Sequence, residues 1–138
     1  MVVRTRSPEE TEAIGHKFAL GLSDDCVVGL YGDLGAGKTC FVRGAARAFH
    51  VSDIVSSPTF SLVNVYRGDR KIVHMDAYRL KSPDEMMRIG FEDYLAEGGI
   101  CFIEWAERIK GIMPVNSREV RFIIVKDTER DIEIIEEL

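Results

Sequence analysis

Two short apolar runs stand out from the otherwise alternating pattern of this chain. Residues 27–31 and 100–103 are almost wholly apolar and partly β-branched, which is typical of strands buried on both faces of a parallel sheet. Alternating apolar and polar positions predict further strands over residues 2–6, 60–66, 71–75, 119–125 and 131–135. The pattern therefore predicts a sheet with a buried centre and more exposed edges.

Helical spacing separates these strands. Ser7 is predicted to cap the first helix with Glu10 closing a capping box, and Ser82 with Glu85 repeats the signal. The first helix carries one apolar stripe, formed by Ile14, Phe18 and Leu22. Helices are expected over residues 8–21, 39–49, 83–90 and 91–96, with a further short one ending near Lys110.

This order of elements predicts an α/β fold in three layers. Segments 60–66 and 71–75 predict one antiparallel hairpin, and segments 119–125 and 131–135 predict another. Residues 1–138 are expected to form a single domain. Its sheet is predicted to be mixed, with a parallel centre and added antiparallel hairpins.

A glycine-rich loop joins the first apolar run to the following helix. It reads Gly32-Asp33-Leu34-Gly35-Ala36-Gly37-Lys38-Thr39 and fits G-x-x-x-x-G-K-[ST] at every fixed position. In this pattern the backbone N–H groups approach phosphate oxygens, the lysine reaches the β- and γ-phosphates, and the hydroxyl is placed to ligate Mg²⁺. An incidental glycine-rich turn is the alternative, which the strand–loop–helix setting disfavours. The predicted single domain is therefore expected to be P-loop NTPase-like.

Composition narrows the class of protein. A chain of 138 residues that is 46% hydrophobic and 30% charged is typical of soluble globular proteins. The net charge of −5 argues against a protein that binds nucleic acid by itself. Arg43 and Arg47 could form a basic face for RNA or a partner, although a plain solvated face is the better interpretation. The chain shows no membrane span or signal segment, and its three scattered cysteines indicate reduced thiols in a cytoplasmic protein.

Two carboxylates come directly after predicted strands. Asp76 follows residues 71–75, and Glu104 follows residues 100–103. Ligands of open α/β sheets bind outside the carboxyl ends of the strands, and P-loop enzymes hold Mg²⁺ with a carboxylate from a second strand. Either residue could instead cap the turn after its strand. From the residues alone, either carboxylate could hold the metal while the other orients water.

Missing motifs limit the kind of nucleotide enzyme. The chain has neither an Asp-x-x-Gly switch nor an Asn-Lys-x-Asp guanine-reading motif, which favours adenine as the base. A small-molecule kinase usually needs an arginine-bearing lid, which is hard to place in a chain of this length with dispersed arginines.

Four segments together resemble the TsaE (YjeE) family of small bacterial P-loop ATPases. They are the loop of residues 32–39, Ser57-Pro58-Thr59-Phe60, His74-Met75-Asp76-Ala77-Tyr78-Arg79-Leu80 and Cys101-Phe102-Ile103-Glu104-Trp105. The resemblance covers nearly the whole chain. It implies a cytoplasmic protein that binds ATP or ADP with Mg²⁺ and is required for threonylcarbamoyladenosine formation in tRNA. Its implied partners are TsaD and TsaB, which transfer the threonylcarbamoyl group, so that tRNA is reached only through the complex.

The resemblance also implies roles for single residues. Lys38 would contact the phosphates, Thr39 and Glu104 would hold Mg²⁺, and Asp76 would orient the hydrolytic water. Trp105 resembles a residue needed for activity, with an ordinary core aromatic as an equal alternative. The predicted catalytic residues are Lys38, Asp76 and Trp105, and the predicted nucleotide contacts are Gly35, Ala36, Gly37, Lys38, Thr39, Cys40, Thr59 and Arg130. The chain departs from the family pattern at Cys40, where a second threonine is common, and at Glu129, where a glycine often precedes the arginine.

Two functions of different classes stay open. One is an ATPase subunit of a tRNA-modifying complex, and the other is a binding module whose docking is gated by the nucleotide. Hydrolysis by the chain alone is expected to be weak and partner-stimulated, because a small domain without a lid leaves the γ-phosphate open to water.

Overall fold

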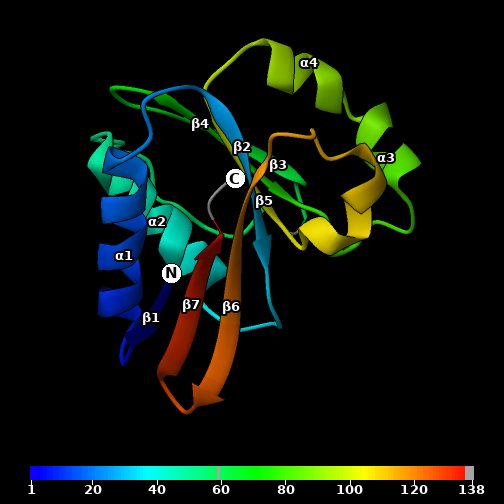
Figure 1. The fold of residues 1–138 in the computed structure, drawn as a ribbon. Coiled ribbons are helices and arrows are strands. Elements are labelled where there is room, and N and C mark those ends of the chain that lie inside the picture. Colours follow the sequence, from blue (N-terminus) through cyan, green and yellow to red (C-terminus); the bar gives the residue numbers. More distant parts are fainter. Residues whose placement is uncertain (59, 136–138) are drawn as a thin grey trace.

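The computed structural model of the protein describes residues 1–58 and 60–135, which form a seven-stranded sheet with helices around it (Figure 1). In sheet order the strands are β1 (Val2–Thr5), β7 (Glu129–Ile135), β6 (Arg118–Lys126), β2 (Cys26–Tyr31), β5 (Ile100–Glu104), β4 (Lys71–Asp76) and β3 (Val63–Arg67). The strand β2 pairs in parallel with β5 and β6, and β5 pairs in parallel with β4. The remaining pairings are antiparallel. The predicted mixed sheet is confirmed.

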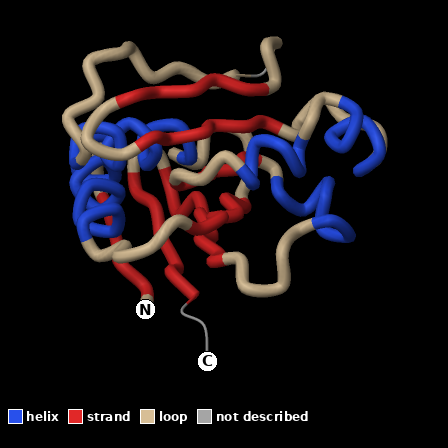
Figure 2. Tube along the Cα trace, turned by 90° about the horizontal axis from the view of Figure 1, so that it is seen from above, coloured by secondary structure: helices blue, strands red, loops and turns tan. Residues whose placement is uncertain are grey.

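Helices cover both faces of this sheet. On one side lie α1 (Pro8–Leu20) and α2 (Lys38–Ala48), and on the other lie α3 (Pro83–Arg88), α4 (Phe91–Ala96) and the 3-10 helix η1 (Ala106–Ile112) (Figure 1, Figure 2). Phe102 belongs to the buried cluster under α1 and α2, whereas its neighbour Ile103 belongs to the cluster under α3 and α4. Successive strand residues point to opposite faces, so the three-layer α/β prediction is confirmed. Within residues 1–58 and 60–135, no helix is long and apolar enough to cross a membrane.

The strand predicted over residues 60–66 begins later than expected. Leu62 adopts a left-handed backbone with φ 69°, and its N–H donates to the Pro58 carbonyl, so this stretch is a turn. The strand β3 therefore starts at Val63. The turn and the strand each alternate, but the phase changes where two apolar residues, Leu62 and Val63, stand together, and the strand begins at that break.

The two predicted capping boxes differ in the structure. The Ser7 hydroxyl accepts a hydrogen bond from the Glu10 N–H at 3.1 Å, as predicted, and the Glu10 carboxylate accepts from the Arg6 N–H. At the start of α3, the Ser82 side chain makes no capping hydrogen bond within the described chain. The Glu85 N–H donates to the Ser82 carbonyl instead, so the second capping box is wrong.

Helices α1 and α2 pack closely through small residues. A Cβ added at Gly15 would overlap the Phe41 carbonyl oxygen, and one added at Gly44 would overlap the Glu12 carbonyl oxygen. The buried residues of α1 are Thr11, Gly15 and Ala19. The predicted apolar stripe lies beside them: Ile14 and Phe18 are only partly buried, and Leu22 is buried. Close helix packing brings the start of α2 into a fixed position at the end of β2.

Gly44→Ala is expected to lower the free energy of unfolding by about 1–3 kcal/mol, the usual cost of overpacking a tight site. The reason is that the new methyl group meets backbone, which cannot turn aside as a side chain would. Urea denaturation measures the change. Gly111→Ala is the matched control, since no atom lies within 4 Å of the Cβ position there. Equal stability of the two variants would contradict the close helix contact.

Candidate functional site

The loop between β2 and α2 has the backbone of an anion-binding turn. Gly35 and Gly37 have φ values of 79° and 106°, in the left-handed region that favours glycine. Gly37 is the N-cap of α2 and has no side chain that could occupy the N–H groups of the first turn. The N-terminus of this helix therefore offers backbone donors and a favourable dipole to an anion.

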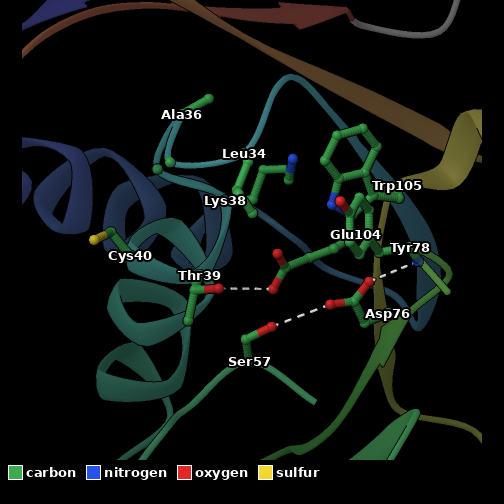
Figure 3. Close-up of a pocket in the computed structure, with 12 residues that line it drawn as sticks. Leu34, Ala36, Lys38, Thr39, Cys40, Ser57, Asp76, Tyr78, Glu104 and Trp105 are labelled. Atoms are coloured by element: carbon green, nitrogen blue, oxygen red, sulfur yellow. Dashed lines mark hydrogen bonds between the residues drawn. The ribbon is translucent and has the colours of Figure 1, made fainter. Parts of the chain in front are cut away.

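A cavity of about 350 Å³ opens beside this loop at the carboxyl ends of β4 and β5. The β4–β5 register places Asp76 opposite Glu104, so the two predicted carboxylates lie side by side (Figure 3). The cavity is lined by Leu34, Gly35, Ala36, Gly37, Lys38, Thr39, Cys40, Ser57, Asp76, Tyr78, Glu104 and Trp105. The structure thus brings together all three predicted catalytic residues, both predicted metal ligands and the predicted loop contacts.

Lys38 lines this cavity and has little exposed surface. Its Nζ donates to the carbonyl oxygens of Gly32 and, at 3.2 Å, of Asp33, and it stands 4.0 Å from the centroid of the Trp105 ring. Burial lowers the pKa of the Lys38 amine, and the nearby Glu104 carboxylate opposes this shift. The partners of the ammonium are therefore neutral carbonyl oxygens and the face of a ring. A phosphate bound along the loop can take the place of these partners.

Trp105 forms one wall of the cavity. Its backbone is left-handed, with φ 58°, and turns the chain immediately after β5. The ring stacks at a tilt on Tyr78, with centroids 4.9 Å apart, and the Arg108 guanidinium stands 5.8 Å from its centroid. The side chain is half-buried, so it is both a support for Lys38 and part of the surface at the cavity mouth.

Thr39 and Glu104 form a pair whose geometry suits magnesium. The Thr39 hydroxyl donates to Glu104 Oε2 at 2.9 Å, and adjacent ligands of an octahedral Mg²⁺ ion lie about 2.9 Å apart. No group of three His, Cys, Asp or Glu residues that could hold a metal occurs within residues 1–58 and 60–135. Mg²⁺ is usually bound by one or two protein oxygens together with substrate phosphates and water, so this donor set fits that ion.

Asp76 is buried and hydrogen-bonded through both carboxylate oxygens. Its Oδ1 accepts from the Tyr78 N–H at 2.8 Å, and its Oδ2 accepts from the Ser57 hydroxyl at 3.1 Å. The first contact is the turn-capping geometry of an Asx turn. The second contact ties the Ser57 loop to the end of β4, so Asp76 combines a structural contact with a position in the cavity wall.

Arg130 lies on the other side of the loop from the two carboxylates. Its Nη2 donates to the Gly35 carbonyl at 3.1 Å, and its Nη1 donates to the carbonyls of Asp127 and Glu129. A smaller hollow of about 80 Å³ lies there, lined by Ser7, Pro8, Thr11, Gly35, Gly37, Cys40, Thr128 and Arg130. Cys40 borders both hollows, and its side chain points away from Asp76 and Glu104 (Figure 3). Arg130 therefore supports the loop backbone as well as facing this second hollow.

The structure describes only part of the segment after Ser57. The predicted nucleotide contact Thr59 lies outside the described residues. Phe60 is 87% exposed, and the Arg79 guanidinium stands 5.0 Å from its ring centroid. The pair comes from two segments, since Phe60 follows Ser57 and Arg79 follows Tyr78, and both Ser57 and Tyr78 line the cavity.

Two residues in or behind the cavity wall were assigned no role from the sequence. Tyr78 lines it directly, and His74 contacts Glu104 Oε2 through Nε2 at 2.6 Å. Both stand in the segment of residues 74–80 that carries the family resemblance. The period of two along β4 puts His74 on the same face as Asp76, a signal that could have marked it.

Comparison with known proteins decides the family. The family model described as "Threonylcarbamoyl adenosine biosynthesis protein TsaE" matches residues 5–132. The chain belongs to the TsaE family. The resemblance noted in the sequence is thereby confirmed, and with it a family role in threonylcarbamoyladenosine biosynthesis for tRNA.

Individual TsaE relatives are similar over most of their length. The tRNA threonylcarbamoyladenosine biosynthesis protein TsaE of Treponema pallidum is 36% identical over 130 residues, covering 94% of this chain and 96% of the relative. The TsaE protein of Bacillus subtilis is 38% identical over 130 residues, covering 94% and 81%. The crystal structure of Bacillus subtilis YdiB matches with a TM-score of 0.82 at 33% identity, covering 97% of this chain and 83% of that chain. These likenesses support an α/β P-loop fold.

Proposed function

We propose that this chain binds and hydrolyses Mg²⁺-ATP in the cavity beside residues 32–39 and that this activity, with TsaD and TsaB, supports threonylcarbamoyladenosine formation in tRNA. The observation that carries the proposal is the meeting of a phosphate loop, a Thr39–Glu104 pair and Asp76 in one cavity of a TsaE-family chain. These are the parts that nucleotide hydrolysis needs: an anion cradle, a metal-binding pair and a group that orients water.

The nucleotide is proposed to lie along the loop, with its phosphates toward Lys38 and its nucleoside toward Arg130. The loop residues Gly35, Gly37 and Cys40 border both hollows, so one extended ligand can contact both. The absence of the two guanine-nucleotide motifs favours adenine as the base.

The charged and polar side chains of the cavity, together with Trp105, then have distinct roles in hydrolysis. Lys38 neutralises charge on the β- and γ-phosphates, and the face of the Trp105 ring holds its ammonium in place. Asp76 accepts a hydrogen bond from the attacking water, while Ser57 keeps the carboxylate oriented. When bound to Thr39 and Glu104, Mg²⁺ neutralises charge that develops on the phosphate oxygens.

A nucleotide-gated docking module is the second candidate. The observation that favours it is a set of aromatic and arginine side chains: Tyr78 and Trp105 line the cavity and have Arg108 against their rings, and the exposed Phe60 has Arg79 against its ring. Tyr, Trp and Arg are enriched among residues that dominate protein interfaces. A partner bound here could close the γ-phosphate side of the site to water.

Steady-state turnover of ATP tests the two candidates against each other. We expect weak hydrolysis by the isolated chain and a clear rise when the TsaD–TsaB pair is added, because a partner can close the site. Docking is measured in parallel with a non-hydrolysable ATP analogue. Docking without any hydrolysis, alone or with the partners, would favour the gated module and contradict the ATPase.

Trp105→Ala refines this test. The variant is expected to lose both docking and stimulated turnover, since the ring contributes to the mouth and supports Lys38. Val115→Ala is a control that also removes an exposed apolar side chain, away from the cavity lining. A Trp105→Ala protein that docks and is stimulated as the wild type would remove Trp105 from the proposal.

A further inference from the structure

One buried side chain touches the metal-binding pair and has no role in the proposed hydrolysis. His74 is 0% exposed, and its Nε2 lies 2.6 Å from Glu104 Oε2, the same oxygen that accepts from the Thr39 hydroxyl. A carboxylate oxygen only accepts hydrogen bonds, so this contact assigns a proton to Nε2. Two donors, one from β4 and one from α2, therefore converge on a single oxygen of Glu104.

The imidazole is held on its other side as well. His74 Nδ1 lies 3.5 Å from the hydroxyl of the buried Tyr66, and with the proton on Nε2 the Nδ1 atom can accept from that hydroxyl. In the sheet, His74 is paired with Asn64 of β3 and with Phe102 of β5. The backbone of His74 is thus held between two strands and its buried ring lies against the Tyr66 hydroxyl, whereas Thr39 and Glu104 stand at element ends.

We infer that His74 is a positioning residue for the magnesium site, which acts by fixing Glu104 Oε2 next to the Thr39 hydroxyl before the nucleotide arrives. The inference rests on the proposed function, because it assigns a task to that same site. A fixed carboxylate oxygen keeps the 2.9 Å spacing of the pair, so the site loses no freedom when the ion binds. Partners that orient a metal ligand typically contribute about 10–100-fold in metal affinity.

Three substitutions at this position separate positioning from general support of the core. His74→Gln puts an amide N–H where Nε2 stands, His74→Asn puts it where Nδ1 stands, and His74→Leu provides no donor. For each variant, the affinity for a fluorescent ADP is measured over a range of Mg²⁺ concentrations, which gives the Mg²⁺ concentration at the midpoint of the rise in affinity. The affinity for ADP is also measured in EDTA, without Mg²⁺. His16→Leu, on the partly exposed surface of α1, is the control for replacing a histidine elsewhere.

The expected pattern depends on where the donor is. His74→Leu and His74→Asn are expected to raise the Mg²⁺ midpoint by about 10–100-fold, while His74→Gln stays near the wild type. Binding of ADP in EDTA should be the same in all proteins. Equal midpoints in the three variants, or a loss of affinity in EDTA as large as that in Mg²⁺, would overturn the inference. If the ADP affinity of the wild type does not depend on Mg²⁺, the magnesium part of the proposed function is overturned instead. The wild-type titration alone gives this result.

A second measurement needs no folded variant. The imidazole of wild-type His74 is observed by ¹⁵N NMR, where the chain has only three histidines to assign. A proton on Nε2 is the expected result, since that atom faces the carboxylate. An unprotonated Nε2 would overturn the inference whatever the variants do.

Discussion

Lys38→Met is expected to abolish most of the nucleotide-dependent function and leave the fold intact. Methionine provides an unbranched apolar side chain of similar length but removes the ammonium that the Gly32 and Asp33 carbonyls and the Trp105 ring now hold. Hydrogen bonds to a charged group contribute about 1.5–3 kcal/mol, so ADP affinity should fall by about ten- to a hundredfold. Turnover should fall further, by about 10²–10³-fold, because charge stabilisation is greatest in the transition state.

Calorimetric titration of ADP and steady-state hydrolysis measure these two effects. Lys17→Met is the matched control, since it removes an exposed lysine on α1 outside the cavity lining. Urea denaturation of Lys38→Met checks that the change lies in the site. Wild-type affinity and turnover in a folded Lys38→Met protein would remove the phosphate loop from the proposal.

The layers of the fold could be predicted from the sequence, because burial leaves a direct mark on it. The strands β2 and β5 are apolar on both faces and therefore read as central strands. The order of the seven strands could not be predicted in this way, since it depends on which edges pair in space. The same holds for the contact between α1 and α2, where Gly15 and Gly44 carry no apolar side chain and leave no mark in a hydrophobic pattern.

The site was predictable where chemistry depends on position along the chain. A phosphate loop is contiguous, and Asp76 and Glu104 each end a strand, so their meeting at one edge follows from parallel pairing. The partners of these groups were not predictable, because they come from other elements. Ser57 reaches Asp76 from a loop, and His74 reaches Glu104 from the adjacent strand.

Asp76→Asn is expected to slow ATP hydrolysis by about 10²–10⁴-fold, the usual contribution of a positioned acid–base group. Mg²⁺-ADP affinity should stay near that of the wild type, because a group that orients water acts on the rate rather than on ground-state binding. Glu104→Gln should show the opposite pattern, with the Mg²⁺ dependence of ADP binding lost, since its Oε2 lies beside the Thr39 hydroxyl. Single-turnover hydrolysis and ADP titrations at several Mg²⁺ concentrations separate the two variants.

The structural contacts of Asp76 offer another explanation for a slow Asp76→Asn protein, and Ser57→Ala tests it. Asparagine keeps an oxygen for the Tyr78 N–H, so the turn after β4 can form, but it changes the partner of the Ser57 hydroxyl. If Asp76 served only to hold the Ser57 loop, Ser57→Ala would slow hydrolysis as much as Asp76→Asn does. We expect a much smaller effect in Ser57→Ala, because the carboxylate that faces the cavity is still present. Equal rates in the two variants would assign Asp76 to the loop, and a loss of Mg²⁺ dependence in Asp76→Asn would exchange its role with that of Glu104.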